Sequence, residues 1–123
     1  MAIPRKDMRR YPRADVRLKV EYTSLGTGVV ETTHTHDLSA SGVCFETEKM
    51  LERGERLRLR FTIPDINRQI EAEAIVVRSF EYEERPFTAV EFIDIPYDDF
   101  LTILDYSLAL FDEQQEKSQS GDG

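Results

Sequence analysis

The sequence lacks the features that mark secreted and membrane-spanning proteins. It has one cysteine, Cys44, which excludes an intramolecular disulfide and is typical of a reducing compartment. No apolar run approaches the roughly 18 residues of a membrane-spanning helix, so no membrane insertion is expected. The N-terminal segment MAIPRKDMRR has no apolar signal-peptide core. A cytoplasmic protein is therefore expected, with Cys44 as a small core residue between Val43 and Phe45.

Signals for catalysis are equally scarce. The chain has no Gly-rich phosphate loop followed by Lys and Ser or Thr, and no nucleophile-elbow motif. The segment HTHD places His34 and His36 on one face of a predicted strand, but a metal site needs a third ligand and Asp37 is expected on the opposite face. Both histidines are therefore expected at the surface or rim, and no enzymatic activity, metal or other cofactor is predicted.

Charge is distributed unevenly along the chain. The net charge is −8, which argues against a general nucleic-acid coat protein, and no DNA or RNA partner is expected. Residues 5–19 nevertheless hold seven basic and two acidic residues, about +5, which leaves about −13 on the rest. An acidic protein with one concentrated basic arm is suited to a small anion. The alternative is that the cluster is a solvated basic tail.

Short alternating segments predict a β protein. Leu57, Leu59, Phe61 and Ile63 alternate with arginines in RLRLRFTIP, the clearest half-buried strand of the sequence. Turn residues separate the predicted strands, which is typical of a small antiparallel barrel or sandwich. The strands are expected at residues 15–24, 29–39, 43–47, 56–64, 68–83 and 85–95.

A helix is predicted at residues 97–117, with Asp98 and Asp99 in its first turn, where the helix dipole favours acids. It carries one apolar stripe, which we expect to lie on the barrel, and a second stripe at Ile103 and Leu110. The second stripe leaves two alternatives, deeper burial in the same domain or a homodimer through this helix. The first stripe comprises Phe100, Leu101, Leu104, Leu108 and Phe111. The predicted organisation is a flexible basic arm (1–14), a barrel (15–96), this helix and a disordered tail (118–123).

The first candidate for anion binding is the segment RRYPR, in which Arg9, Arg10 and Arg13 form R-x-x-x-R. A planar guanidinium can bind phosphate oxygens through two hydrogen bonds, or the O6/N7 edge of guanine in the same way. It can also stack on a base. Lysine would supply the charge without this geometry.

The second candidate is D-x-S-x-x-G, formed by Asp37, Ser39 and Gly42 in the segment DLSASG. Asp37 and Ser39 are two residues apart on a strand and so share a face. A carboxylate can accept from guanine N1–H and N2–H₂, and Ser39 can bond a phosphate or a backbone amide. Gly42 permits a backbone shape closed to other residues, or the close approach of a ligand. By itself this segment is also compatible with a Ser-rich hairpin turn.

Together, in this order and at this separation, the two motifs resemble those of PilZ domains, whose members typically bind the bacterial second messenger cyclic di-GMP. The resemblance covers about residues 5–95, including the closing segment FTAVEFIDI. It implies a six-stranded antiparallel barrel with the ligand on its outer surface and the arm folded over it. It also implies that Arg9, Arg10, Arg13, Asp37, Ser39 and Gly42 bind the ligand. Two positions depart from the family pattern, Met8 in place of a basic residue and Ala89 in place of glycine.

The resemblance implies a non-catalytic receptor that passes its signal to an effector protein by ordering of the arm, in processes such as motility, pili, polysaccharide export or virulence. One alternative is a PilZ-like adaptor that acts by protein contact without nucleotide. Another is a small-barrel binder of single-stranded nucleic acid, which would need a basic stripe such as Arg56, Arg58 and Arg60. Acidic residues on the next strand are expected to offset that stripe: Glu71, Glu73, Glu81, Glu83 and Glu84.

Overall fold

The computed structural model describes residues 11–120, with side chains described as far as Lys117. Most of the predicted arm, including Arg9 and Arg10, lies outside the described residues, as do residues 121–123 of the predicted tail. Within the described range, no helix combines the length and apolar character needed to cross a membrane. The elements are β1 (Ala14–Asp15), β2 (Lys19–Ser24), β3 (Val30–Ser39), β4 (Gly42–Glu46), β5 (Arg56–Ile63), β6 (Arg68–Tyr82), β7 (Arg85–Asp94) and α1 (Tyr97–Ser120).

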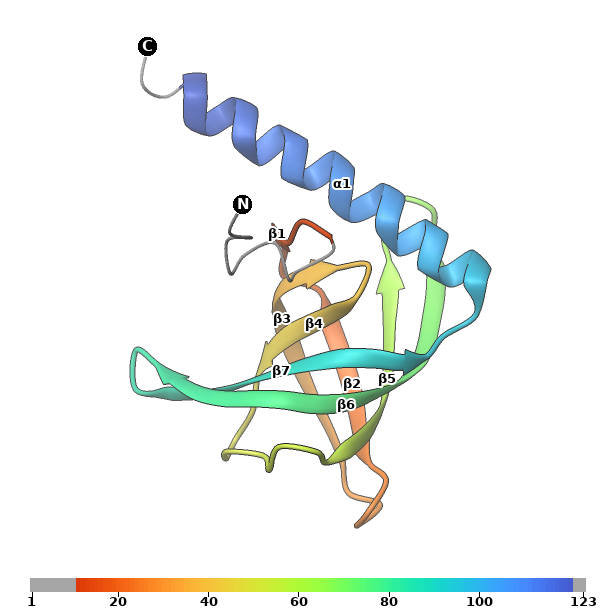
Figure 1. The fold of residues 1–123 in the computed structure, drawn as a ribbon, viewed down its shortest axis with the longest axis vertical. Coiled ribbons are helices and arrows are strands. Elements are labelled where there is room, and N and C mark those ends of the chain that lie inside the picture. The colour runs from red at the N-terminus through yellow and green to blue at the C-terminus, as the bar shows by residue number, and fades with distance from the viewer. Residues whose placement is uncertain (1–10, 121–123) are drawn as a thin grey trace, which may run out of the picture.

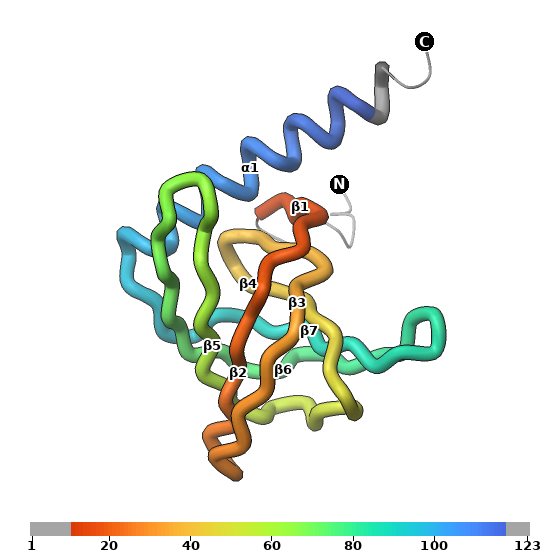
Figure 2. The backbone as a smooth tube through the Cα atoms, turned by 180° about the vertical axis from the view of Figure 1, so that it is seen from behind, coloured from red at the N-terminus to blue at the C-terminus, as the bar shows by residue number. Residues whose placement is uncertain are grey.

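Six strands form a closed antiparallel barrel. They follow the order β3-β2-β5-β6-β7-β4, and a further pairing of β3 with β4 closes the ring. The two-residue strand β1 pairs with Asp37 and Leu38 near the C-terminal end of β3, beyond the stretch that pairs with β2. The β6–β7 hairpin is the longest and extends sideways from the barrel, as both views show (Figures 1 and 2). The predicted barrel with a C-terminal helix is thus confirmed.

Strict alternation on β5 builds one wall of the core. Leu57, Leu59, Phe61 and Ile63 are each at most 2% exposed, while the arginines between them are exposed. Two of those arginines meet acids of the neighbouring strand, because the antiparallel register places them close together. Arg56 lies 3.2 Å from Glu73, and Arg60 lies 3.2 Å from Glu71. These pairs offset part of the predicted basic stripe.

The first predicted strand, residues 15–24, is interrupted. The chain forms β1 at Ala14–Asp15, and β2 begins only at Lys19, although Val16 and Leu18 between them still make backbone hydrogen bonds to β3. The cause is the buried hydroxyl of Thr35 on β3, which accepts from the backbone N–H of Leu18 at 2.8 Å and donates to the carbonyl of Val16. This side chain therefore satisfies backbone groups that ladder partners would otherwise pair with.

Helix α1 lies across one end of the barrel (Figures 1 and 2). Ile103 is fully buried in the core cluster, and Ser107 beside it is 1% exposed, whereas Leu101 is 37% exposed. The prediction that the stripe containing Leu101 faces the barrel is therefore wrong for that residue, and Ile103 of the second stripe makes the contact. Because Ser107 is small, the helix can lie close to the barrel at this position. Its buried hydroxyl donates to the carbonyl of Ile103 at 2.7 Å and so is not left without a partner.

Polar contacts fix both halves of α1. Near its start, the Arg68 guanidinium binds the mostly buried carboxylate of Asp99 at 2.7 Å. Farther along, the Gln114 side chain accepts from the backbone N–H of Asp15 at 3.1 Å and donates to its carbonyl at 2.7 Å. The two hydrogen bonds to Gln114 give β1 a partner on the edge that does not pair with β3. The helix thereby positions the segment that carries Arg13.

Candidate functional site

An open groove lies where α1 meets the β3–β4 hairpin and β7. Its volume is about 1010 Å³, at the upper end of the range typical of small-molecule sites. Its lining includes four of the six predicted ligand-binding residues: Arg13, Asp37, Ser39 and Gly42. The other two, Arg9 and Arg10, precede Arg13 in the chain and lie outside the described residues.

Aromatic packing brings the end of the basic segment to the groove. The Tyr11 ring meets the Phe100 ring of α1 edge to face, with centroids 5.6 Å apart. Ala14 is fully buried and pairs with Leu38 through β1. Arg13 lies between these two anchors, and its exposed side chain lines the groove. The segment Tyr11–Ala14 is therefore held on the same side of the barrel as the D-x-S-x-x-G motif.

A β-bulge sets the position of Asp37. The register of β3 against β4 shifts between Thr35 and Asp37, so strict side-chain alternation breaks at His36. His36 Nδ1 then lies 3.2 Å from the Asp37 carboxylate. The prediction that Asp37 points away from both histidines is thus wrong for His36. The Asp37 side chain is 12% exposed and lines the groove, so its carboxylate oxygens can accept further hydrogen bonds from a ligand there.

Ser39 shapes the turn rather than presenting a free hydroxyl. Its side chain is nearly buried, and its Oγ accepts from the backbone N–H of Ser41 at 3.2 Å. The Oγ atoms of Ser39 and Ser41 lie 3.0 Å apart. This is the backbone-amide role that was one of the two predicted for Ser39. The hairpin end is consequently rigid, with Ser41 carrying the more accessible hydroxyl.

Gly42 is required by a close approach of two strands. A Cβ atom built on it would lie 2.0 Å from the carbonyl oxygen of Val90 on β7, a distance that no side chain can occupy. Gly42 pairs with Glu91, and Cys44 pairs with Ala89. The glycine therefore lets β4 lie against β7 along the floor of the groove. The close approach predicted for Gly42 was that of a ligand, whereas the structure shows the close approach of strand β7.

The pKa of the Cys44 thiol reflects its burial and the charges around the floor of the groove. Burial raises the pKa of its thiol to about 12, and the nearby Asp37 carboxylate adds to this effect. The guanidinium groups of Arg13 and Arg78 act in the opposite direction on the pKa of Cys44. A thiol with so high a pKa stays protonated and unreactive near neutral pH, in keeping with its prediction as a small core residue.

Arg78 was not identified from the sequence. It follows a second register shift, between Val76 and Arg78 on β6, and lines the groove beside Ala89. Its guanidinium lies 4.6 Å from the centre of the Phe80 ring, which fixes its orientation. The available signal was a single base interrupting the apolar run AIVVRSF. Sequence alone did not show that this base faces the same groove as Arg13.

The two histidines lie at the surface, as expected. His36 packs edge to face on Phe87 and Tyr82 of the long hairpin, with centroids 5.6 and 6.1 Å apart. His34 is exposed, with Arg17 Nη2 3.4 Å from its Nδ1. Across the described residues, no three His, Cys, Asp or Glu side chains are grouped so as to hold a metal ion.

Several proteins of known structure are similar to the chain. The Bacillus subtilis inhibitor of motility (MotI/DgrA) has a TM-score of 0.77 and 29% identity, covering 89% of this chain and 52% of that one. The PilZ domain of Escherichia coli YcgR with c-di-GMP has a TM-score of 0.65 and 17% identity, covering 90% and 97%. The K. pneumonia MrkH–c-di-GMP complex has a TM-score of 0.69 and 20% identity, covering 89% and 54%.

These matches differ in extent. The chain spans about half the length of MotI/DgrA and of MrkH, but nearly all of the isolated YcgR domain. None of the curated proteins matches the chain. The PilZ domain family model matches residues 7–109, which include the R-x-x-x-R segment, the whole barrel and half of α1. The chain therefore belongs to the PilZ domain family.

Proposed function

We propose that this protein is a non-catalytic receptor that binds cyclic di-GMP in the groove beside α1. The single observation that carries the proposal is that Arg13 lines the same groove as Asp37, Ser39 and Gly42. Two of the structurally similar PilZ proteins are described in complex with c-di-GMP. Family membership and the groove geometry thus support the same ligand.

The groove offers complementary groups for both parts of this ligand. Arg13 and Arg78 supply guanidinium groups for the two phosphates and for the O6/N7 edge of guanine. Asp37 supplies a carboxylate that can accept from guanine N1–H and N2–H₂. The hairpin turn next to it is stiffened by the Ser39–Ser41 contact, so the ligand meets a surface that needs little rearrangement.

Arg9 and Arg10 would complete the site. They lie four and three residues before Arg13, so an extended chain keeps both within about 15 Å of it. Two phosphates on one ligand would attract these bases and bring the preceding segment onto the groove. That ordering is the proposed signal, because it changes the surface next to α1 that an effector protein can contact.

The proposed downstream processes are motility or biofilm formation, as for an inhibitor of motility among the similar structures. An effector protein would dock on the rearranged arm, on α1 or on the barrel face. The alternative function is an adaptor that acts by protein contact without nucleotide. A homodimer through α1 remains a prediction.

Calorimetric titration of the full chain with cyclic di-GMP tests the proposal. We expect saturable binding by cyclic di-GMP and much weaker binding by the linear GMP dinucleotide, since only the cyclic form holds both guanines and both phosphates in a fixed arrangement. Replacing Arg78 with alanine should weaken binding by roughly tenfold or more, the effect of losing one guanidinium contact. Absence of any heat with cyclic di-GMP would favour the adaptor alternative.

A further inference from the structure

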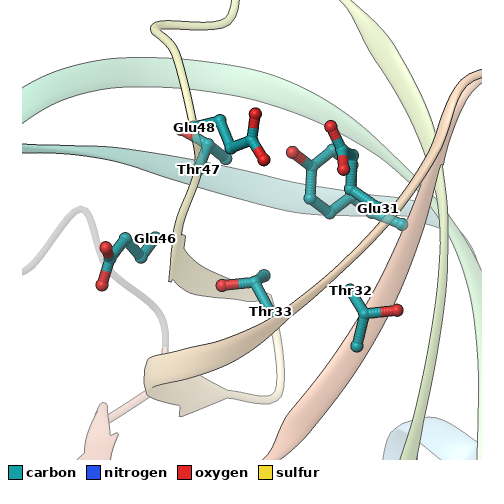
Figure 3. A pocket seen from close by; sticks show the side chains of 7 residues that line it. Glu31, Thr32, Thr33, Glu46, Thr47 and Glu48 are labelled. Atoms are coloured by element: carbon teal, nitrogen blue, oxygen red, sulfur yellow. The ribbon is translucent and has the colours of Figure 1, made fainter.

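A second, smaller hollow lies at the end of the barrel opposite α1. Its volume is about 130 Å³, enough for several water molecules. Residues Glu31–Thr33 of β3 form one side, and Glu46 of β4 and the following Thr47 and Glu48 form the other, with Tyr22 of β2 also lining the hollow. Figure 3 shows Glu31 and Glu48 approaching the hollow from opposite sides, while Glu46 lies apart from them.

Tyr22 brings a polar group close to the facing carboxylates of this hollow. The residue is only 5% exposed, and its ring stacks on Phe45 with centroids 5.1 Å apart. Among the described residues, its hydroxyl makes no hydrogen bond to another side chain or to the backbone, although a buried hydroxyl normally has a partner. Tyr22 lines the hollow together with Glu31 and Glu48.

The two facing carboxylates have no basic partner among the described residues. Within residues 11–117, neither Glu31 nor Glu48 has a Lys, Arg or His nitrogen within 4.0 Å. Glu46, by contrast, lies 3.3 Å from Arg85 Nη1. Burial, and after it the charges of Glu31, Glu48 and Glu55, raise the pKa of Tyr22 to about 12. The phenol therefore keeps its proton near neutral pH, and the negative charges of Glu31, Glu48 and Glu55 all act on it.

We propose that this hollow is a binding site for one guanidinium group, with Glu31 and Glu48 as its carboxylate acceptors and Tyr22 as its hydroxyl partner. Guanidinium carries five N–H donors in one plane and so can reach acceptors that stand on different sides of a small space. The Thr33 and Thr47 side chains add polar lining. The ligand is either the side chain of an arginine on a partner protein or a free alkylguanidine, since both present the same group.

This site is independent of the proposed cyclic di-GMP groove. None of the groove residues lines the hollow, and none of the hollow residues lines the groove. A cyclic dinucleotide with two phosphates would be repelled by the paired carboxylates. The inference would therefore stand if cyclic di-GMP failed to bind.

Nuclear magnetic resonance of the full chain with ¹³C-labelled tyrosine rings tests the proposal, with propylguanidine as the probe and Tyr22→Phe to assign the signal. We expect a saturable shift of the Tyr22 ring with a dissociation constant of about a millimolar, since each partly exposed ion pair contributes little. Glu48→Gln should weaken binding at least threefold. Glu113→Gln on α1, which removes the same charge from an exposed position on another element, should leave binding unchanged.

Controls separate the site from general charge attraction. Tetramethylammonium at equal ionic strength has the charge without N–H donors and should not shift the Tyr22 ring. N-acetyl-arginine methylamide distinguishes the two sources: binding equal to that of propylguanidine indicates a protein side chain, and binding by propylguanidine alone indicates a free guanidine. A shift that never saturates, an equal response to tetramethylammonium or to CaCl₂, or unchanged binding by a folded Glu48→Gln variant would each overturn the proposal.

Discussion

The two ends of the barrel hold hollows of opposite character, yet the same hairpin supplies both. The C-terminal end of β3 and the start of β4 give Asp37 and Gly42 to the groove beside α1, where Arg13 and Arg78 bring positive charge. The other end of this hairpin gives Glu31 and Glu46 to an acidic hollow. A net charge of −8 thus predicts little about either site, because local arrangement decides which ligand each end can accept.

The largest expected effect comes from Gly42→Ala, which tests whether the groove end depends on close strand approach. The added Cβ would lie 2.0 Å from the Val90 carbonyl oxygen, so β4 and β7 must separate. We expect the free energy of unfolding to fall by about 2 kcal/mol or more, and cyclic di-GMP binding to be lost. Urea denaturation measures the first effect and calorimetry the second.

Gly26→Ala is the matched control for this substitution. No atom lies within 4 Å of a Cβ built on Gly26, and its φ is not positive. Its free energy of unfolding should change by less than about 0.5 kcal/mol, as for most surface substitutions. Equal stability of the two variants would show that the barrel tolerates separation of β4 from β7.

Arg13→Ala separates ligand binding from folding at the same end. Its exposed guanidinium lines the groove, and loss of one well-placed contact of about 1–3 kcal/mol should weaken cyclic di-GMP binding by roughly ten- to a hundredfold. The unfolding midpoint should stay unchanged. Arg53→Ala removes the same charge from an exposed loop and should bind like the parent chain. Equal losses of cyclic di-GMP binding in the two variants would show that Arg13 contributes only its charge.

Alkaline pH should lower the free energy of unfolding through one buried group at each end of the barrel, first Cys44 at the groove and then Tyr22 at the acidic hollow. In the folded protein the pKa of Cys44 and that of Tyr22 are both raised to about 12, from ordinary values of 9.0 and 10.0. The unfolded chain therefore loses these protons first, and stability falls as pH rises above 9 for Cys44 and above 10 for Tyr22. Each group contributes a slope of up to about 1.4 kcal/mol per pH unit, which ends near pH 12.

Denaturation from pH 8 to 11 with two variants isolates these contributions. Cys44→Ala should remove the fall that begins near pH 9, and Tyr22→Phe should remove the fall that begins near pH 10. Each comparison is with the slope of the parent chain, since the other titrating groups are shared. Slopes identical to the parent in both variants would show that neither group is protected from ionisation by the fold.

The smallest expected effect is that of Gln114→Ala, which tests whether α1 supports the groove. Gln114 makes two hydrogen bonds to the backbone of Asp15, two residues after Arg13. Because these bonds are exposed, we expect a loss of about 1 kcal/mol in stability and a few-fold weaker cyclic di-GMP binding. Gln115→Ala, at the exposed neighbouring position, is the control. A variant indistinguishable from this control would show that β1 holds Arg13 without the helix.

The sequence predicts those parts of the fold that depend on local periodicity. Alternation in RLRLRFTIP defines β5 and its core face, and turn residues separate the other strands correctly. The helix is predicted, but its buried face is not, because apolar residues occupy two stripes and only tertiary contact selects Ile103. The break between β1 and β2 was missed because it depends on Thr35, a residue far along the chain.

The candidate site shows the same division. Arg13, Asp37, Ser39 and Gly42 are recognisable as motif residues, and the structure brings all four to one groove. Long-range facts were not predictable, because they depend on strand register and bulges. The Gly42–Val90 approach, the His36–Asp37 contact and the place of Arg78 are of this kind.

The most direct test of the central claim is to map cyclic di-GMP on the backbone amide signals of the labelled chain. We predict that Ser41, Gly42 and Cys44, at the groove, shift on binding, while Thr32 and Thr33, at the acidic hollow, do not. Binding that left the groove signals in place and moved those of the opposite end would contradict the account.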